Sequence, residues 1–240
     1  MFDSTRTAPR PLLVSIATLA ALAAVGCAAP IEEALKLSAK RAFVAPVDFN
    51  VATPTQFEPG LEVTDQLVQM FLKHRGLKVE RVPLGRFTKL WRAATEGKRL
   101  ATDSPEVAIA AGKILAELAP GDEHSVLVLP GLSSRIGELA GTKARWDGTA
   151  QKVIYEGLRD DHSGHLSGPT NAASIWIRVF SSSGRLVHEG YGGTELTWKY
   201  GGRSSGNRWY YAVVERDDLF RDQAIVANGI KLAFDPYIPK

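Results

Sequence analysis

The stretch Ser125-Val126-Leu127-Val128-Leu129 is a short apolar run without polar alternation, and Pro130 follows it directly. An uninterrupted run of this length and composition is typical of a strand at the centre of a sheet that is covered on both faces. We therefore expect a central strand over 125–129, with helices packed on either side of it.

Strand and helix patterns alternate on the amino-terminal side of this run. Apolar residues at helical spacing mark two helices. Ser104-Pro105-Glu106 marks the start of a third, because serine caps a helix and proline is favoured at its first position. The expected order is strand 41–48, loop 49–60, helix 61–75, strand 77–82, helix 86–96 and helix 104–118.

After Pro130 the apolar segments become shorter, and glycine, serine and charged residues become more frequent. The second half alone has too few long apolar elements for a core of its own. The pattern therefore predicts one α/β domain over 41–240, with a central mixed sheet flanked by helices in three layers. The expected later elements are strand 151–155, strand 174–180, a turn at 182–184, strand 185–191, a long loop at 192–208 and a helix over 219–234 capped by Asp218.

The amino terminus carries a leader pattern. Arg6 and Arg10 precede an apolar stretch over 12–25, which is shorter than the roughly 20 residues that span a bilayer as a helix but has the length of a signal-peptide core. It ends in Ala24-Val25-Gly26-Cys27, which resembles the lipobox of bacterial lipoproteins, with Ala24 where that family usually has leucine. The alternative is an ordinary leader cut near Ala28-Ala29-Pro30.

The lipobox resemblance implies cleavage before Cys27 and acylation of its thiol. It divides the chain into a signal peptide at 1–26, a lipidated cysteine and tether at 27–40, and the domain at 41–240. Several acyl chains on one cysteine anchor a protein firmly, whereas a single chain holds it only reversibly. In enteric lipoproteins an aspartate after the cysteine retains the protein at the inner membrane, so Ala28 implies the outer membrane, facing the periplasm.

The charge balance argues against a nucleic-acid binder, and the cysteine content excludes an internal disulfide. The 29 basic and 26 acidic residues are well mixed and leave a net charge of +3, which is not the footprint of a nucleic-acid binder. Cys27 is the only cysteine, so the mature domain folds without an internal disulfide.

Three segments, read in order, resemble one group of envelope proteins. They are Leu77-Lys-Val-Glu-Arg81 with Phe87 and Leu90-Trp91 after it, the helix 108–118 that leads into 125–129, and Gly184-Arg-Leu-Val-His-Glu-Gly190. This order is similar to the CsgG-like, LpoB-like and TolB amino-terminal group. The resemblance implies a central mixed sheet and a role in binding and assembly rather than catalysis. One branch of the group forms a secretion pore, but the long alternating hairpin that a pore needs is not evident in the sequence.

Two segments bear on catalysis or metal binding. Asp160, Asp161, His162 and His165 have side chains that ligate zinc, yet a loop rich in Asp, Ser and Gly offers no fixed backbone to converge them. Ser133 and Ser134 follow the central strand, as a nucleophile does in an elbow, but the second glycine of that turn is missing. We therefore expect no metal, no cofactor and no catalytic set.

Aromatic and cationic residues gather near the carboxyl end of the expected loop. Such residues are enriched where proteins grip their partners. The alternative is that the rings pack inward from two strands. The candidate binding surface consists of Trp198, Tyr200, Arg203, Arg208, Trp209 and Tyr211.

The sequence favours an envelope lipoprotein that works as a non-enzymatic binding or assembly module, held at the membrane by Cys27 and docked to an envelope protein. Two alternatives stay open. One is a periplasmic hydrolase acting on cell-wall material, which would need a paired nucleophile and base. The other is an oligomeric component of an export assembly.

Overall fold

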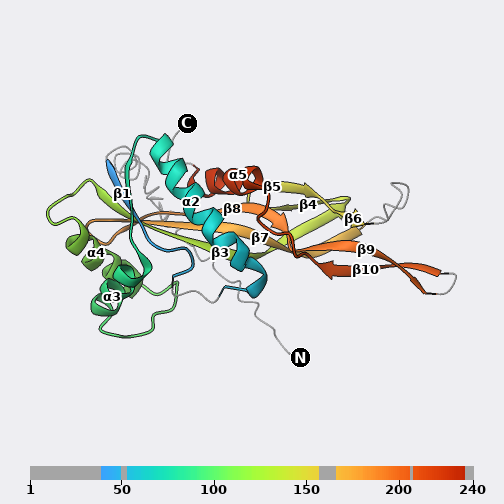
Figure 1. Cartoon of the computed structure of the whole chain (residues 1–240), viewed down its shortest axis with the longest axis horizontal. Coiled ribbons are helices and arrows are strands. Elements are labelled where there is room, and N and C mark those ends of the chain that lie inside the picture. Colours follow the sequence, from blue (N-terminus) through green and yellow to red (C-terminus); the bar gives the residue numbers. More distant parts are fainter. Residues whose placement is uncertain (1–38, 50–52, 157–165, 206–207, 236–240) are drawn as a thin grey trace, which may run out of the picture.

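The central strand is present, and it lies in the middle of a mixed sheet (Figure 1). A computed structural model describes residues 39–49, 53–156, 166–205 and 208–235. Within these residues the main sheet has the order β2-β1-β3-β7-β8. β1 and β2 run parallel to their neighbours, whereas β7 is antiparallel to β3 and β8 to β7. The strands are β1 Arg41–Val44, β2 Lys78–Arg81, β3 Ser125–Gly141, β7 Leu166–Ser181 and β8 Leu186–Leu196.

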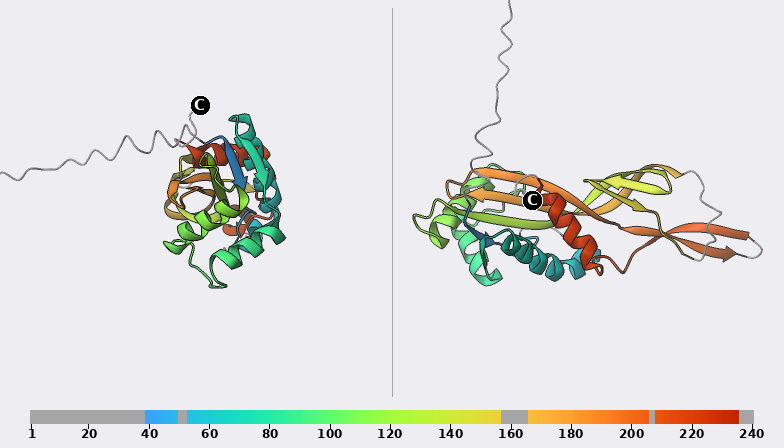
Figure 2. Two further views of the ribbon diagram at one scale, coloured as in Figure 1. Left: turned by 90° about the vertical axis from the view of Figure 1, so that its left-hand side faces the viewer. Right: turned by 90° about the horizontal axis from the view of Figure 1, so that it is seen from above.

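Helices cover both faces of this sheet, so the expected three-layer α/β fold is confirmed. One face carries Val126, Val128 and Ile177, which pack against α2 and α5. The other face carries Phe43, Leu127 and Phe180, which pack against α3 and α4. Figure 2 shows the sheet end-on between these helices. The helices are α2 Glu58–His74, preceded by a 3-10 turn at Thr55–Phe57, α3 Leu84–Ala94, α4 Glu106–Leu118 and α5 Gln223–Phe234.

The prediction that the central strand ends at Pro130 is wrong, because β3 continues to Gly141. Pro130 is paired with Ile177 of β7, and its carbonyl accepts a hydrogen bond from Asp48 N at 3.1 Å, on the side where β1 has just ended. The nitrogen and carbonyl of one strand residue point to the same side. The missing N–H of Pro130 therefore points away from β7, toward the side of β3 that β1 no longer covers. Proline is tolerated at such an unpaired edge because no ladder hydrogen bond is lost.

Beyond β1 the sheet continues into a distal part. β4 Lys143–Trp146 and β5 Thr149–Lys152 extend it from β3, and hydrogen bonds from Gly193 N to the Asp147 carbonyl (3.0 Å) and from Leu196 N to Gln151 Oε1 (2.7 Å) bring β5 beside β8. A second sheet of β6 Tyr155–Glu156, β9 Trp198–Ser205 and β10 Arg208–Glu215 follows. Its β9–β10 hairpin projects past the end of the main sheet (Figure 2).

The long loop expected at 192–208 is therefore wrong: most of it belongs to β8 and β9. Gly192 in this segment and Gly190 just before it serve close packing rather than turns. A Cβ on Gly192 would lie 1.8 Å from the Gly229 carbonyl oxygen, and one on Gly190 would lie 2.2 Å from that of Ala233, so α5 rests directly on the backbone of β8. This helix begins after Asp222, which caps Ala224 N at 2.9 Å, and not after Asp218 as the sequence suggested.

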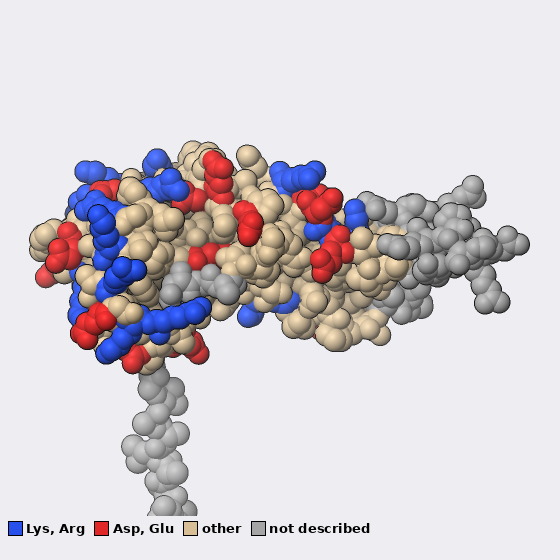
Figure 3. Space-filling model, turned by 60° about the horizontal axis from the view of Figure 1, so that its bottom comes forward, with Lys and Arg blue, Asp and Glu red and all other residues tan. Residues whose placement is uncertain are grey.

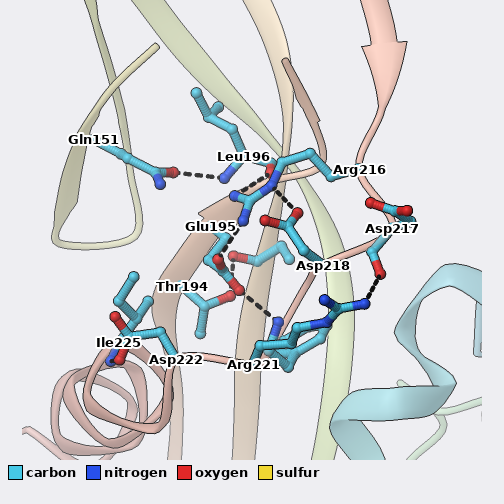
Figure 4. Close-up of polar contacts among 12 residues, drawn as sticks. Gln151, Thr194, Glu195, Leu196, Arg216, Asp217, Asp218, Arg221, Asp222 and Ile225 are labelled. Atoms are coloured by element: carbon cyan, nitrogen blue, oxygen red, sulfur yellow. Dashed lines mark hydrogen bonds and ion pairs between the residues drawn. The ribbon is translucent and has the colours of Figure 1, made fainter. Parts of the chain in front are cut away.

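A buried polar cluster fixes the base of the β9–β10 hairpin (Figure 4). Arg216, just after β10, forms an ion pair with Glu195 of β8 at 2.9 Å and another with Asp218 at 2.7 Å. The second oxygen of Glu195 accepts the Phe220 N–H at 2.6 Å. This cluster therefore links three segments: the base of the β9–β10 hairpin, strand β8 and the residues just before α5.

Candidate functional site

A groove opens where the α3–α4 layer stops covering the sheet. Along β7, alternate residues Phe180, Arg178 and Trp176 point to the α4 face. Phe180 is in the core beside α4, whereas Arg178 and Trp176 continue past the helix start and line a groove of about 510 Å³. Its other walls come from the segment before α4, the first turn of α4 and strand β8, through Thr102, Asp103, Ser104, Pro105, Val107, Ala108, Leu186, Glu189 and Tyr191.

Arg178 is the unusual side chain of this groove, because it is only 8% exposed. Its Nη1 donates to the Thr102 carbonyl, and no acceptor within the described chain meets Nε. Nε is fully enclosed. Burial lowers the pKa of Arg178, and the negative charges of Glu189 and Asp103 oppose that shift from beyond ion-pair distance. A buried guanidinium without a carboxylate partner is costly, and arginine is almost never buried unless it is paired.

Trp176 and Tyr191 continue the groove as a stack of aromatic and cationic groups. The two rings are 5.8 Å apart and nearly parallel, at 6°. The Arg178 guanidinium lies 4.1 Å from the Trp176 ring centre, and that of Arg135 lies 4.2 Å from the Tyr191 ring centre. Contacts of this kind are favourable by about 0.5–2 kcal/mol, the larger value where water is excluded.

Second contacts fix the positions of these groups. The indole N–H of Trp176 donates to Glu189 Oε1 at 2.9 Å. Gly131 lies opposite Trp176 on β3, where an added Cβ would come within 2.9 Å of Asp48 Oδ1 and would contact the indole at 3.6 Å. Asp147 accepts from Arg135 Nε at 3.0 Å and from Ser174 Oγ at 2.7 Å. These contacts restrict the side chains of the groove wall, so little side-chain entropy would be lost on binding.

Charge is unevenly distributed over the surface. Lys and Arg gather, with acidic residues between them, at the end of the molecule that carries α3 and α4 (Figure 3). Exposed Arg86, Lys89 and Arg92 lie on α3 itself. At the groove, by contrast, the exposed charged residues among the lining are Asp103 and Glu189. Among the described lining residues the exposed charges are therefore acidic and Arg178 is buried, while Arg135 lies over the Tyr191 ring at the edge of the groove.

The candidate surface on 198–211 divides in the structure. Trp198 is 8% exposed, its indole N–H donates to Thr170 Oγ1 at 2.7 Å, and its ring packs edge-on against Tyr200 at 4.9 Å. Trp198 therefore belongs to the small distal core, and its assignment to an exposed surface is corrected. Tyr200 is half-buried. The backbones of Arg203, Arg208, Trp209 and Tyr211 pair within β9–β10, while their side chains lie outside what the structure describes.

The other predicted site residues are dispersed or not described. Cys27, Asp160, Asp161, His162 and His165 lie outside the described residues. Ser133 lies within β3, not at a strand-to-helix turn, and its hydroxyl donates to the carbonyl of Ser134 at 3.4 Å. In the described ranges no three His, Cys, Asp or Glu side chains gather as a metal site.

Sequence reasoning missed Arg178 and Trp176. The pattern of Ile175-Trp-Ile-Arg-Val-Phe180 predicts a strand, and the segment does form part of β7. The one sequence signal for this site is Arg178 itself, because an arginine within an otherwise apolar strand is rarely buried unless it is paired. Nothing in the sequence indicated that the loop before α4 would meet it.

Comparison with known proteins found no matching family, no similar curated protein and no similar solved structure. None of the described helices is long and apolar enough to cross a bilayer.

Proposed function

We propose that this chain is a lipid-anchored envelope lipoprotein that faces the periplasm from the outer membrane and works by binding a partner. The observation that carries the proposal is the sequence Ala24-Val25-Gly26-Cys27 after a short apolar stretch, with Cys27 the only cysteine of the chain. Acylation of Cys27 would hold the domain at the bilayer face.

The distance between anchor and domain is compatible with this arrangement. Strand β1 begins at Arg41, so residues 28–40 join Cys27 to the sheet. Fully extended, these residues reach about 45 Å. The length of this segment therefore sets an upper limit of about 45 Å on the distance between Cys27 and the start of the sheet.

The groove supports binding as the role of the domain. Concave sites lined by apolar and aromatic side chains, with a few converging polar groups, are the usual form of a binding pocket. Here Trp176 and Tyr191 supply the aromatic wall, and Arg178 and Glu189 supply the polar groups. The order of strands and helices, which resembles an envelope group that works by assembly, points to an envelope protein as the partner.

Replacement of the thiol tests the anchor directly. The variant Cys27→Ser, made in the full precursor and expressed in a bacterium, should move from the membrane pellet to the soluble periplasmic fraction or accumulate as unprocessed precursor. The matched control is Ala24→Leu, which restores the residue usual in a lipobox and should stay in the membrane as processed protein. Processed Cys27→Ser that still pellets with membranes would contradict the proposal.

A further inference from the structure

We infer that the groove beside α4 binds an amino-acid group as a zwitterion, with its carboxylate on Arg178 and its ammonium between Asp103 and Glu189. This inference rests on the proposed binding role and names the chemistry that the groove recognises. A free amino acid carries such a group.

The buried arginine calls for an anion. Arg178 lines the groove and donates from Nη1 to the Thr102 carbonyl, while its Nε is buried without a hydrogen-bond partner in the described chain. A guanidinium matches a carboxylate in geometry and charge better than any other cation does. A carboxylate at this position would satisfy a donor that the protein itself leaves open, and it would neutralise a buried charge.

The acidic mouth excludes a simple anion and calls for a cation as well. The negative charges of Asp103 and of Glu189, the cross-strand neighbour of Arg178, act on the Arg178 guanidinium. Both are exposed. An anion alone would be repelled by the two carboxylates, and an amine alone would leave Arg178 unpaired. A ligand with both charges, as an amino acid carries, complements all three groups.

The remaining walls accommodate an apolar side chain. Val107 and Phe180 are buried core residues that also line the groove, and Leu186 on β8 is 42% exposed. The groove volume of about 510 Å³ is within the range of small-molecule sites, so it admits a free amino acid with a bulky apolar side chain. We therefore expect aliphatic amino acids to bind better than glycine.

The test uses the mature lipoprotein in detergent and three matched probes. L-leucine carries both charges, 4-methylpentanoate lacks the amine, and 3-methylbutylamine lacks the carboxylate. Binding is measured by isothermal titration calorimetry, and the Arg178 side-chain N–H resonance is followed by ¹⁵N NMR. Leucine should bind at least about tenfold more tightly than either analogue and should shift the arginine resonance, since each lost charge pair removes a charge-assisted hydrogen bond.

Variants assign the contacts. Arg178→Gln should weaken leucine binding at least about tenfold, and Asp103→Asn and Glu189→Gln several-fold each. Lys98→Gln, an exposed cation that does not line the groove, is the matched control and should bind as the parent does. Because Asp103 is exposed, its variant reports on binding even if Arg178→Gln fails to fold.

Three outcomes would overturn the inference. Equal binding of leucine and 4-methylpentanoate would make the groove an anion site only. Equal binding of leucine and the amine would make it a cation site only. No binding of any probe at millimolar concentration would reject the groove as a ligand site. Each of these leaves the Cys27 fractionation result unaffected, so failure of the inference is distinguishable from failure of the proposed anchor.

Discussion

Glu195 and Arg216 form an ion pair in the interior, 2.9 Å apart, with side chains only 3% and 5% exposed. Burial alone would lower the pKa of Arg216, but its hydrogen bond to Asp218 and the charges of Glu195 and Asp218 outweigh this effect and raise that pKa. Because the other oxygen of Glu195 accepts the Phe220 N–H, one carboxylate holds both the hairpin base and the approach to α5.

We predict that Glu195→Gln destabilises the domain by about 3 kcal/mol, the lower end of the cost of breaking a buried ion pair, because Asp218 remains as a counter-charge to Arg216. Urea unfolding followed by tryptophan fluorescence measures the loss. The control is Glu96→Gln, which removes the exposed partner of Lys98 and should change stability by less than about 1 kcal/mol. Equal effects of the two substitutions would show that the buried pair has no special role.

Asp48 gives a prediction that depends on pH. Its carboxylate accepts the Leu132 N–H at 2.6 Å and the Thr53 hydroxyl, and burial raises its pKa despite both hydrogen bonds. A folded-state pKa above the unfolded value means that the protonated form is favoured in the fold, so the wild-type chain loses stability as pH rises through that pKa.

The isosteric variant Asp48→Asn cannot titrate, and asparagine suits the left-handed backbone at this position (φ 55°). The stability of the variant minus that of the wild type should therefore be greatest at neutral pH. It should shrink as pH falls through the folded-state pKa toward the ordinary aspartate value of about 3.9. Urea unfolding of both chains at pH 7 and at about pH 4.5 measures this difference, and a difference that grows on acidification would refute the argument.

The contact between α5 and β8 depends on glycine. Gly192→Ala would place a methyl group 1.8 Å from the Gly229 carbonyl oxygen, and both atoms belong to packed backbone. We expect a loss of at least about 3 kcal/mol, the upper end of the usual cost of overpacking. Gly85→Ala, at an open position in α3, should leave stability unchanged or raise it by up to about 1 kcal/mol. Thermal melting curves compare the two variants.

Much of the fold could be predicted from the sequence because local signals and tertiary packing agree there. Ser104-Pro105-Glu106 does start a helix, and 125–129 does form the centre of the sheet. The sequence misled where a tertiary contact decided the structure. Pro130 was read as a strand end, although it faces the gap left by β1, and Gly192 was read as part of a loop, although it lies beneath α5.

The candidate site was less predictable for the same reason. Arg178 and Trp176 lie on one face of β7, but their importance depends on where α4 begins and on Glu189 across the strand pair. Trp198 was selected for its residue type, whereas its indole is a core hydrogen-bond donor to Thr170. Which aromatic side chain remains accessible depends on long-range strand pairing, which composition does not reveal.

The residue after the anchor gives a prediction about sorting. If the chain follows the enteric lipoprotein rule, Ala28→Asp should move the mature protein from the outer to the inner membrane without loss of lipid. Sucrose-gradient separation of the two membranes in an enteric host measures the shift, and Ala28→Ser is the matched control that should stay in the outer membrane. An unchanged distribution of Ala28→Asp would refute outer-membrane sorting through this position.

The most direct test of the lipid anchor is intact-mass spectrometry of the mature wild-type protein extracted from membranes. We predict a polypeptide that begins at Cys27 and is heavier than its amino-acid sequence by the mass of a diacylglyceryl group, with or without a further acyl chain. A polypeptide that begins elsewhere, or one that begins at Cys27 with an unmodified thiol, would contradict the account.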